Sequence, residues 1–286
     1  MRFMVLVKGN ADSEAGKLPS ERELSKMGVY NQELIDAGMM VGGEGLRPSS
    51  SATRVRYERG TTTVVDGPFT EAKEVVAGYW LLKAKSKEDV IDWLKRAPGF
   101  ERDGELEVRE LYEAEDFGGE SNAPAPPEAP AKPNTKRYLT MLFADAKTEA
   151  ELTPTEGNQE LLEKMGALMG EIAAQGALVS GDGLKPSSNG AKIHFSGATR
   201  RVVDGPFSEA KELIAGVSLV RASSKQEAVE WARRMLVIHC EGVGVAKGQV
   251  EVRPVFETED FPVDPSEKPG GWREQEIAFR EGSGHG

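Results

Sequence analysis

Cysteine is almost missing from this sequence. Cys240 is the only cysteine among 286 residues, and histidine occurs three times. A single cysteine excludes an internal disulfide and fits a reducing compartment, so we expect a cytoplasmic protein. So few histidines and cysteines also give too few ligands at workable spacings for a metal centre. We therefore expect no metal.

Long apolar runs and basic stripes are missing as well. The apolar run Phe3–Val7 stops at Lys8, which is too short for a signal peptide or a membrane span. The formal net charge of −11 is shared evenly between the two halves of the chain, without a cluster of basic residues in either. Binding to nucleic acid or to a membrane surface is therefore not expected. The glycines of residues 42–45 precede no helical pattern, so they do not form a dinucleotide-binding motif, and we expect no cofactor.

What the sequence does contain is an internal repeat. The segment Asp66–Glu74 recurs 138 residues later as Asp204–Glu212, with a single change of threonine to serine. Residues 43–50 match residues 181–188 at six of eight positions with the same offset. The helical segment between residues 21 and 38 is much less alike in the two copies. The chain is thus two copies of one unit.

The repeat and the composition together predict the domain organisation. Residues 1–117 form the first unit and residues 136–261 form the second. Between them, residues 118–135 are rich in proline, alanine and glutamate and predict a semi-rigid linker. Residues 262–286 form a tail rich in proline and glycine, in which a short helix could form around Trp272.

Hydrophobic periodicity predicts the same elements in both units. In the first unit it indicates helices over residues 20–37 and 87–96. It indicates strands over residues 3–7, 39–46, 53–57, 61–65, 75–84 and 106–112. This order is typical of an α+β fold, with helices on one face of a mostly antiparallel sheet. The open face of the sheet needs cover, and the second copy can provide it.

These segments resemble the YCII-related family, whose DGPF-type members carry the string found at Asp66–Phe69 and Asp204–Phe207. The stretch Gly43–Ser49 and the late pairs Val108-Arg109 and Val252-Arg253 add to the resemblance, which covers nearly all of both units. The resemblance implies two ferredoxin-like units that form an intramolecular dimeric α+β barrel. The two units would pair with each other through their sheets, and further oligomerisation is possible. The resemblance to this family does not imply an activity.

The repeated loop is also the densest cluster of reactive side chains. Asp66 and Asp204 are the candidate catalytic residues, because each ends an apolar strand beside further charged groups. The candidate ligand-binding residues are Arg47, Glu71, Lys73, Lys185, Glu209 and Lys211. A purely structural role is the alternative, since an aspartate there can bond to its own turn and the other charges can form ion pairs.

Two functions remain open. The first is a small-molecule-binding or regulatory module with a polar pocket near each repeated loop and an unknown ligand. The second is a cofactor-independent enzyme that uses Asp66 and Asp204 for acid–base chemistry. Some related proteins resemble each other in a helix histidine that pairs with an aspartate. Met27 and Met165 stand at that position here, which weakens the second function.

The three histidines carry little chemistry in this sequence. His194 aligns with Arg56 of the first copy, so an exposed strand position is expected. His239 and Cys240 are adjacent in a segment that is longer in the second copy, and we interpret that segment as a loop. His285 lies in a glycine-rich end.

Overall fold

The computed structural model describes residues 1–69, 75–100, 103–117, 134–150, 159–207 and 213–261, together with Glu274, Ile277 and Ala278. The first unit contains, in chain order, β1 (Arg2–Lys8), α1 (Ala11–Glu14), α2 (Glu21–Asp36), β2 (Met40–Gly45), β3 (Thr53–Glu58), β4 (Thr61–Asp66), β5 (Val76–Lys83), α3 (Lys87–Leu94) and β6 (Asp103–Glu110). The second unit contains β7 (Lys136–Phe143), α4 (Gln159–Ala174), β8 (Leu178–Gly183), β9 (Ala191–Ser196), β10 (Thr199–Asp204), β11 (Ile214–Ala222), α5 (Lys225–Val243) and β12 (Lys247–Pro254).

Local chemistry sets the ends of several elements. The Ser20 side chain accepts the backbone N–H of Glu23, whose carboxylate accepts the N–H of Ser20, and this capping box starts α2. Gly38 follows the helix with a φ of 68°, a conformation that glycine adopts without strain. The turn between β3 and β4 is made by Arg59 and Gly60, both with positive φ, as a tight hairpin requires.

The strands form two antiparallel sheets of six, and each sheet contains strands of both units. The orders are β10-β9-β6-β1-β5-β2 and β4-β3-β12-β7-β11-β8. The hairpin β3–β4 of the first unit therefore pairs with β12 of the second, and the hairpin β9–β10 pairs with β6 of the first. The sequence analysis predicted both hairpins but did not assign them to a sheet. Strand periodicity shows which face of a strand is apolar but not which neighbour it pairs with.

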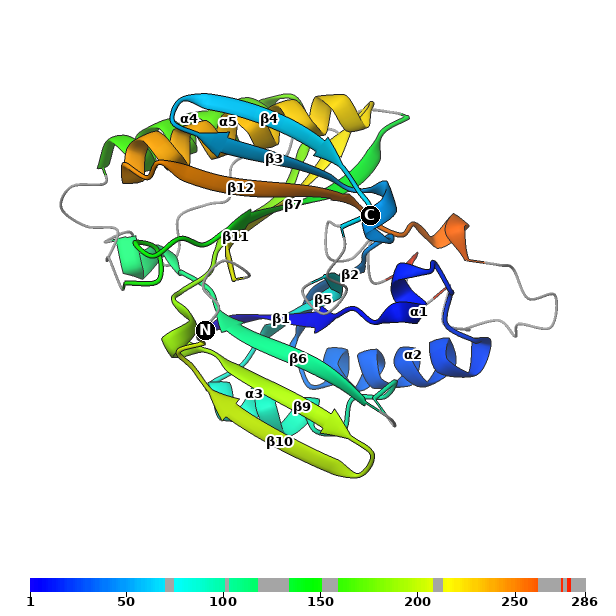
Figure 1. Cartoon of the computed structure of the whole chain (residues 1–286). Coiled ribbons are helices and arrows are strands. Elements are labelled where there is room, and N and C mark those ends of the chain that lie inside the picture. Colours follow the sequence, from blue (N-terminus) through cyan, green and yellow to red (C-terminus); the bar gives the residue numbers. More distant parts are fainter. Residues whose placement is uncertain are drawn as a thin grey trace.

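The two sheets face each other, with the helices on the outside (Figure 1). A core of buried apolar side chains fills the space between the sheets, with Leu6, Leu81, Leu139 and Leu219 among its members. Each sheet also forms a separate core with the helices that cover its outer face. The fold is the predicted intramolecular dimeric α+β barrel, in which each unit covers the open sheet face of the other.

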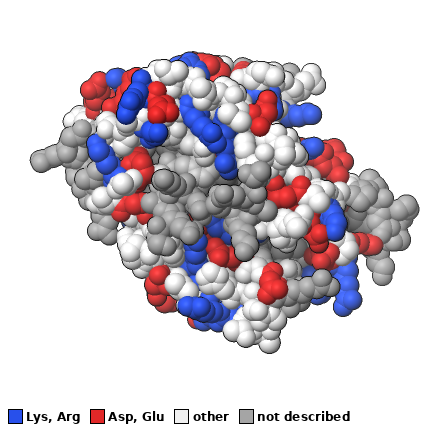
Figure 2. Space-filling view, in the orientation of Figure 1, with Lys and Arg blue, Asp and Glu red and all other residues white. Residues whose placement is uncertain are grey.

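The barrel is closed where the edge strands β2 and β8 meet the opposite sheet. Leu46 forms a bridge with Val255, and Leu111 forms the equivalent bridge with Leu184. Charged residues of both signs are mixed over the face shown in Figure 2, without a stripe of basic residues there. None of the helices in the described part of the chain is long and apolar enough to cross a membrane.

Candidate functional site

The repeated loops follow β4 and β10, and packing accounts for their glycines. A Cβ built on Gly67 would lie 1.9 Å from the carbonyl oxygen of Ser49, and one on Gly205 would lie 1.8 Å from that of Ser187. The following Gly-Pro peptide bonds are cis in both loops. No larger residue fits at this contact without moving the backbone.

The buried Ser49 and Ser187 hydroxyls hold the same loops by hydrogen bonds. The Ser49 Oγ accepts the Phe69 N–H at 3.2 Å, and the Ser187 Oγ accepts the Phe207 N–H at 3.1 Å. Each serine is also bound by a carboxylate from the segment after the first strand of its unit: Glu14 accepts the Ser49 N–H at 3.1 Å. Glu149 accepts the Ser187 N–H at 2.9 Å. The glycine and the phenylalanine N–H of the repeated motif therefore serve to pack the loop against the buried serine.

Asp66 and Asp204 lie at the surface and connect the units. The Asp66 Oδ1 accepts hydrogen bonds from the Thr53 hydroxyl at 2.5 Å and from the Lys225 ammonium at 2.9 Å. These two partners lower the pKa of the Asp66 carboxyl, although its side chain is 69% exposed. Asp204, 70% exposed, binds Lys87 at 2.8 Å. The lysines begin α5 and α3, so each aspartate contacts a helix of the other unit.

The other candidate residues are only partly described. Arg47 pairs with Asp260. Lys185 pairs with Glu110 at 3.0 Å and with Asp116 at 3.1 Å, so both cations also link the two units. Burial alone would lower the pKa of the Lys185 ammonium, but its two carboxylate partners outweigh burial and raise it. Glu71, Lys73, Glu209 and Lys211 lie outside the described residues.

Buried charges form two similar sets on the last strands of the units, β6 and β12. Glu107 binds Lys8 at 2.8 Å and the fully buried Arg109 at 3.3 Å. In the second set Glu251 binds both Arg253 and Arg54. Burial would raise the pKa of the Glu107 carboxyl, but Lys8 and Arg109 outweigh it and the pKa falls. The repeated Glu-Val-Arg string at residues 107–109 and 251–253 was the sequence signal for these sets.

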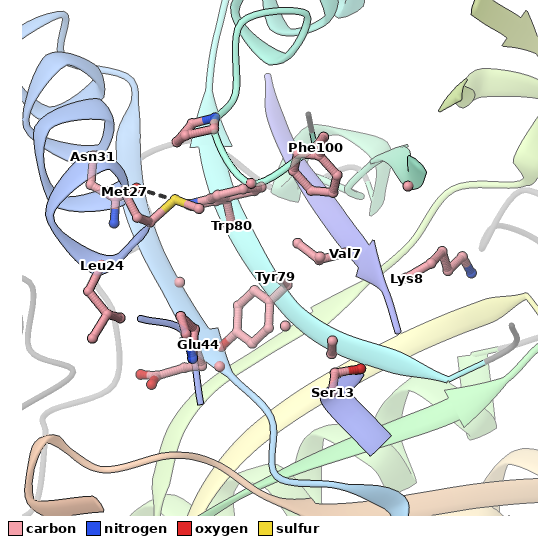
Figure 3. A pocket seen from close by; sticks show the side chains of 18 of the residues that line it. Val7, Lys8, Ser13, Leu24, Met27, Asn31, Glu44, Tyr79, Trp80 and Phe100 are labelled. Atoms are coloured by element: carbon pink, nitrogen blue, oxygen red, sulfur yellow. Dashed lines mark hydrogen bonds between the residues drawn. The ribbon is translucent and has the colours of Figure 1, made fainter. Parts of the chain in front are cut away.

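A cavity of about 910 Å³ lies in the first unit, between α2 and one end of its sheet. Figure 3 shows Met27, Trp80, Val7 and Phe100 around it, whereas the ammonium of Lys8 points away from this group. Its aromatic lining residues are Tyr79, Trp80, Phe100, Phe195, Phe256 and Phe261, and the last three come from the second unit. Its lining glycines, which put no side chain into the space, are Gly9, Gly28, Gly43, Gly45, Gly78, Gly99 and Gly104.

Most charged groups in the cavity wall have partners of opposite charge. Lys8 is held by Glu107, as above. Glu44 accepts a hydrogen bond from Arg137 of the second unit. Glu105 binds Lys192 at 3.3 Å and His194 at 3.1 Å. Deeper in the wall, the Trp80 indole N–H donates to Asn31 at 3.1 Å. The cavity thus offers flat apolar surfaces and no uncompensated lysine or arginine among its described lining residues.

The second unit differs from the first in the helix that precedes its last strand. There α5 runs for 19 residues, whereas α3 has 8. A Cβ on Gly248, the counterpart of Gly104, would lie 2.4 Å from the sulfur of Cys240 on α5. A Cβ on Gly242 would lie 2.8 Å from the Cβ of Leu161 in α4. The added turns of α5 therefore pack directly against the sheet and the neighbouring helical segment.

The same helix corrects our interpretation of His239 and Cys240. They lie in α5 and are buried, not in a loop, because the apolar residues Trp231, Met235 and Leu236 continue a helical stripe toward them. The His239 Nε2 lies 3.2 Å from the Asp145 carboxylate. Burial raises the pKa of the Cys240 thiol to about 12. His194 is half-exposed on β9, as expected.

The sequence reasoning missed the cavity. Neither Asp66, Asp204, Arg47 nor Lys185 is among its lining residues. Met27, the position assigned to the helix histidine of some relatives, does line it. In the described ranges, no group of three or more histidine, cysteine, aspartate and glutamate side chains is placed to hold a metal ion.

The model of the YCII-related domain matches the chain twice, over residues 1–115 and 138–259. These matches cover most of the sequence, and the chain belongs to the YCII-related domain family. An uncharacterized protein of Rhizobium meliloti (strain 1021) is 29% identical over 79 residues, which is 28% of this chain and 64% of that protein. The match thus spans less than two thirds of the relative.

Among solved structures, the chain is similar to an anthrone oxidase-like protein, with a TM-score of 0.32, 9% identity and coverage of 90% of both chains. It is also similar to a chlorite dismutase-like protein, with a TM-score of 0.37, 6% identity and coverage of 90% of this chain and 94% of the other. At these scores neither likeness says anything about activity.

Proposed function

We propose that this protein binds a neutral, largely apolar small molecule that contains a flat ring, in the cavity of the first unit. The observation that carries the proposal is the cavity itself. Its volume of about 910 Å³ lies within the range of roughly 300–1,000 Å³ typical of small-molecule sites. Aromatic side chains such as Tyr79, Trp80 and Phe100 supply flat surfaces for stacking.

Charge decides the ligand class. The ammonium of Lys8 is compensated by Glu107, and the carboxylates Glu44, Glu105 and Asp103 also belong to the wall. An anionic ligand would lose its hydration without gaining a free cation, and burying an unpaired charge is costly. A carboxylate, sulfonate or phosphate ester is therefore disfavoured. The proposal assigns one ligand to this cavity.

A pair of fluorescent probes tests this function. N-phenyl-1-naphthylamine is neutral, and 8-anilinonaphthalene-1-sulfonate is the same ring system with a sulfonate. We expect the neutral probe to bind at one per chain, and the sulfonate to bind at least about tenfold more weakly. Met27→Trp should fill the cavity and abolish binding of the neutral probe. Met165→Trp, at the repeated position of the second unit, is the matched control and should leave binding unchanged.

Absence of saturable binding of the neutral probe, or equal loss in both tryptophan variants, would overturn the proposal. The alternative, acid–base chemistry at Asp66 and Asp204, stays a prediction. A lowered pKa makes Asp66 a weaker proton acceptor, so it does not favour general-base chemistry. The variant with both Asp66→Asn and Asp204→Asn tests it. If the parent and this variant bind a ligand or convert a substrate equally well, the aspartates are not part of the site.

A further inference from the structure

The outer edges of the two sheets are formed by β4 and β10. The opposite edges, β2 and β8, continue around the barrel corners. Phe256 donates its N–H to Gly45 at 2.8 Å, and Tyr112 donates to Gly183 at 2.9 Å. By contrast, β4 pairs only with β3, and β10 pairs only with β9, among the described strands. Figure 1 shows these two edges on opposite sides of the molecule.

The repeat makes β4 and β10 a matched pair, and they differ in one respect. β10 reads Thr-Arg-Arg-Val-Val-Asp, whereas β4 reads Thr-Thr-Thr-Val-Val-Asp. Arg200 and Arg201 thus stand where the first unit has Thr62 and Thr63. Charged side chains on an edge strand are a common device against pairing with another chain. The β10 edge carries this device and the β4 edge does not.

The β4 edge is also apolar for a surface strand. Val64 is 56% exposed and Val65 is 38% exposed, so two adjacent β-branched residues face water. From Thr61 to Val65 no side chain is charged. Threonine and valine are residues that strands favour, and cross-strand pairs between them stabilise a sheet. The segment therefore has the backbone, the side chains and the neutrality of a strand that accepts a partner.

We propose that the partner is a second copy of this chain, which pairs β4 with β4 in antiparallel orientation about a twofold axis. In a pairing centred on Thr63, the two Thr63 residues oppose each other, each Thr62 opposes a Val64 and each Thr61 opposes a Val65. The only charged residue of the strand, Asp66, falls at the end and is already bound to Lys225. The same pairing through β10 would gather four arginines, which repel one another.

The proposed pairing continues a sheet that already joins the two units, because β4 pairs with β3, and β3 pairs with β12 of the second unit. Antiparallel pairing of the two β4 strands would join the six-stranded sheets of two copies into one continuous sheet. A contact of six residues from each copy is smaller than a standard protein interface, so the dimer forms at high concentration and dissociates on dilution.

Sedimentation velocity over about a hundredfold range of concentration tests the proposal. The parent protein should shift from monomer to dimer as its concentration rises. The variant with Thr62→Arg and Thr63→Arg, which copies β10 onto β4, should remain a monomer throughout. Val64→Lys, at an exposed position, should act in the same way. Circular dichroism and thermal unfolding show that these variants are folded.

The converse variant, with Arg200→Thr and Arg201→Thr, removes the charges from β10 and should associate beyond the dimer, because both edges then accept a strand. Amide hydrogen exchange adds a local measurement: residues 61–65 should become more protected at high concentration. A parent that is monomeric throughout, or a dimer that survives the arginine substitutions in β4, would overturn the proposal.

Discussion

Gly67 lies directly against the backbone of Ser49, so closely that a Cβ on Gly67 would stand 1.9 Å from the Ser49 carbonyl oxygen. The same contact recurs between Gly205 and Ser187. This contact explains why the glycine of the repeated motif is needed for packing, independently of any chemistry in the loop. It also fixes where the hairpin ends relative to the barrel corner.

Gly67→Ala should therefore destabilise the protein. The added methyl group meets backbone, which cannot rotate away, and the expected loss in the free energy of unfolding is about 2–3 kcal/mol. Urea unfolding measures it. Gly166→Ala is the control, since a Cβ there has nothing within 4 Å in α4 and alanine favours helix. The control should be neutral or slightly stabilising, and an equally mild effect at Gly67 would contradict the packing role.

Glu107→Gln should destabilise the protein in a pH-dependent way. The carboxylate compensates Lys8 and Arg109, and its loss should cost about 3 kcal/mol at neutral pH. Because the folded pKa of Glu107 is lowered, its contribution is complete above the unfolded pKa of about 4.3. It is lost as the pH falls through the folded pKa.

Urea unfolding at a series of pH values from neutral to acidic checks this. The parent and Glu107→Gln should differ most near neutral pH and approach each other in acid. Glu105→Gln changes a partly exposed carboxylate of the same strand and should cost less than about 1 kcal/mol. A constant difference between parent and Glu107→Gln at every pH would show that Glu107 does not act through its charge.

Cys240 should not react with thiol reagents in the folded protein. The side chain is buried in α5 and the pKa of its thiol is raised to about 12, so almost no thiolate is present near neutral pH. Iodoacetamide should leave the native protein unmodified and alkylate it in denaturant, as mass spectrometry would show. Rapid alkylation of the native protein would mean that the end of α5 opens.

The sequence predicted the strands and the helices α2 and α3 of the first unit within a few residues, because amphipathic patterns, Gly38 and the Arg59-Gly60 turn are local signals, but it did not predict the short helix α1. It also predicted that the two sheets cover each other, because a sheet face with apolar side chains such as Leu6 and Leu81 has to be buried against another layer. It did not predict which sheet takes each hairpin, because β6 and β12 are equivalent neighbours for β3 in composition.

The cavity was hidden for a different reason. Its wall is lined by glycines and by residues of α2, several strands and the second unit, which are far apart in the sequence. A reading of residues one at a time does not indicate an empty space between such segments. The repeated loop drew attention instead, since identical charged residues are visible in a sequence. Whether Asp66 and Asp204 have a chemical role stays a prediction, and their described contacts join the units.

The exchange of hairpins is the central claim, and engineered disulfides test it most directly. Arg56 on β3 lies opposite Gln249 on β12, whereas Glu105 on β6 lies opposite His194 on β9. If each hairpin stayed in its own unit, Arg56 would lie opposite Glu105 instead. Directly opposed strand residues are about 4.5–5.5 Å apart, within reach of a disulfide.

The measurement is oxidation of two double variants, followed by mass spectrometry of the linked peptides. Arg56→Cys with Gln249→Cys should form an intramolecular disulfide, and Arg56→Cys with Glu105→Cys should not. A disulfide between positions 56 and 105, with none between 56 and 249, would show that the hairpins are not exchanged and would contradict this account.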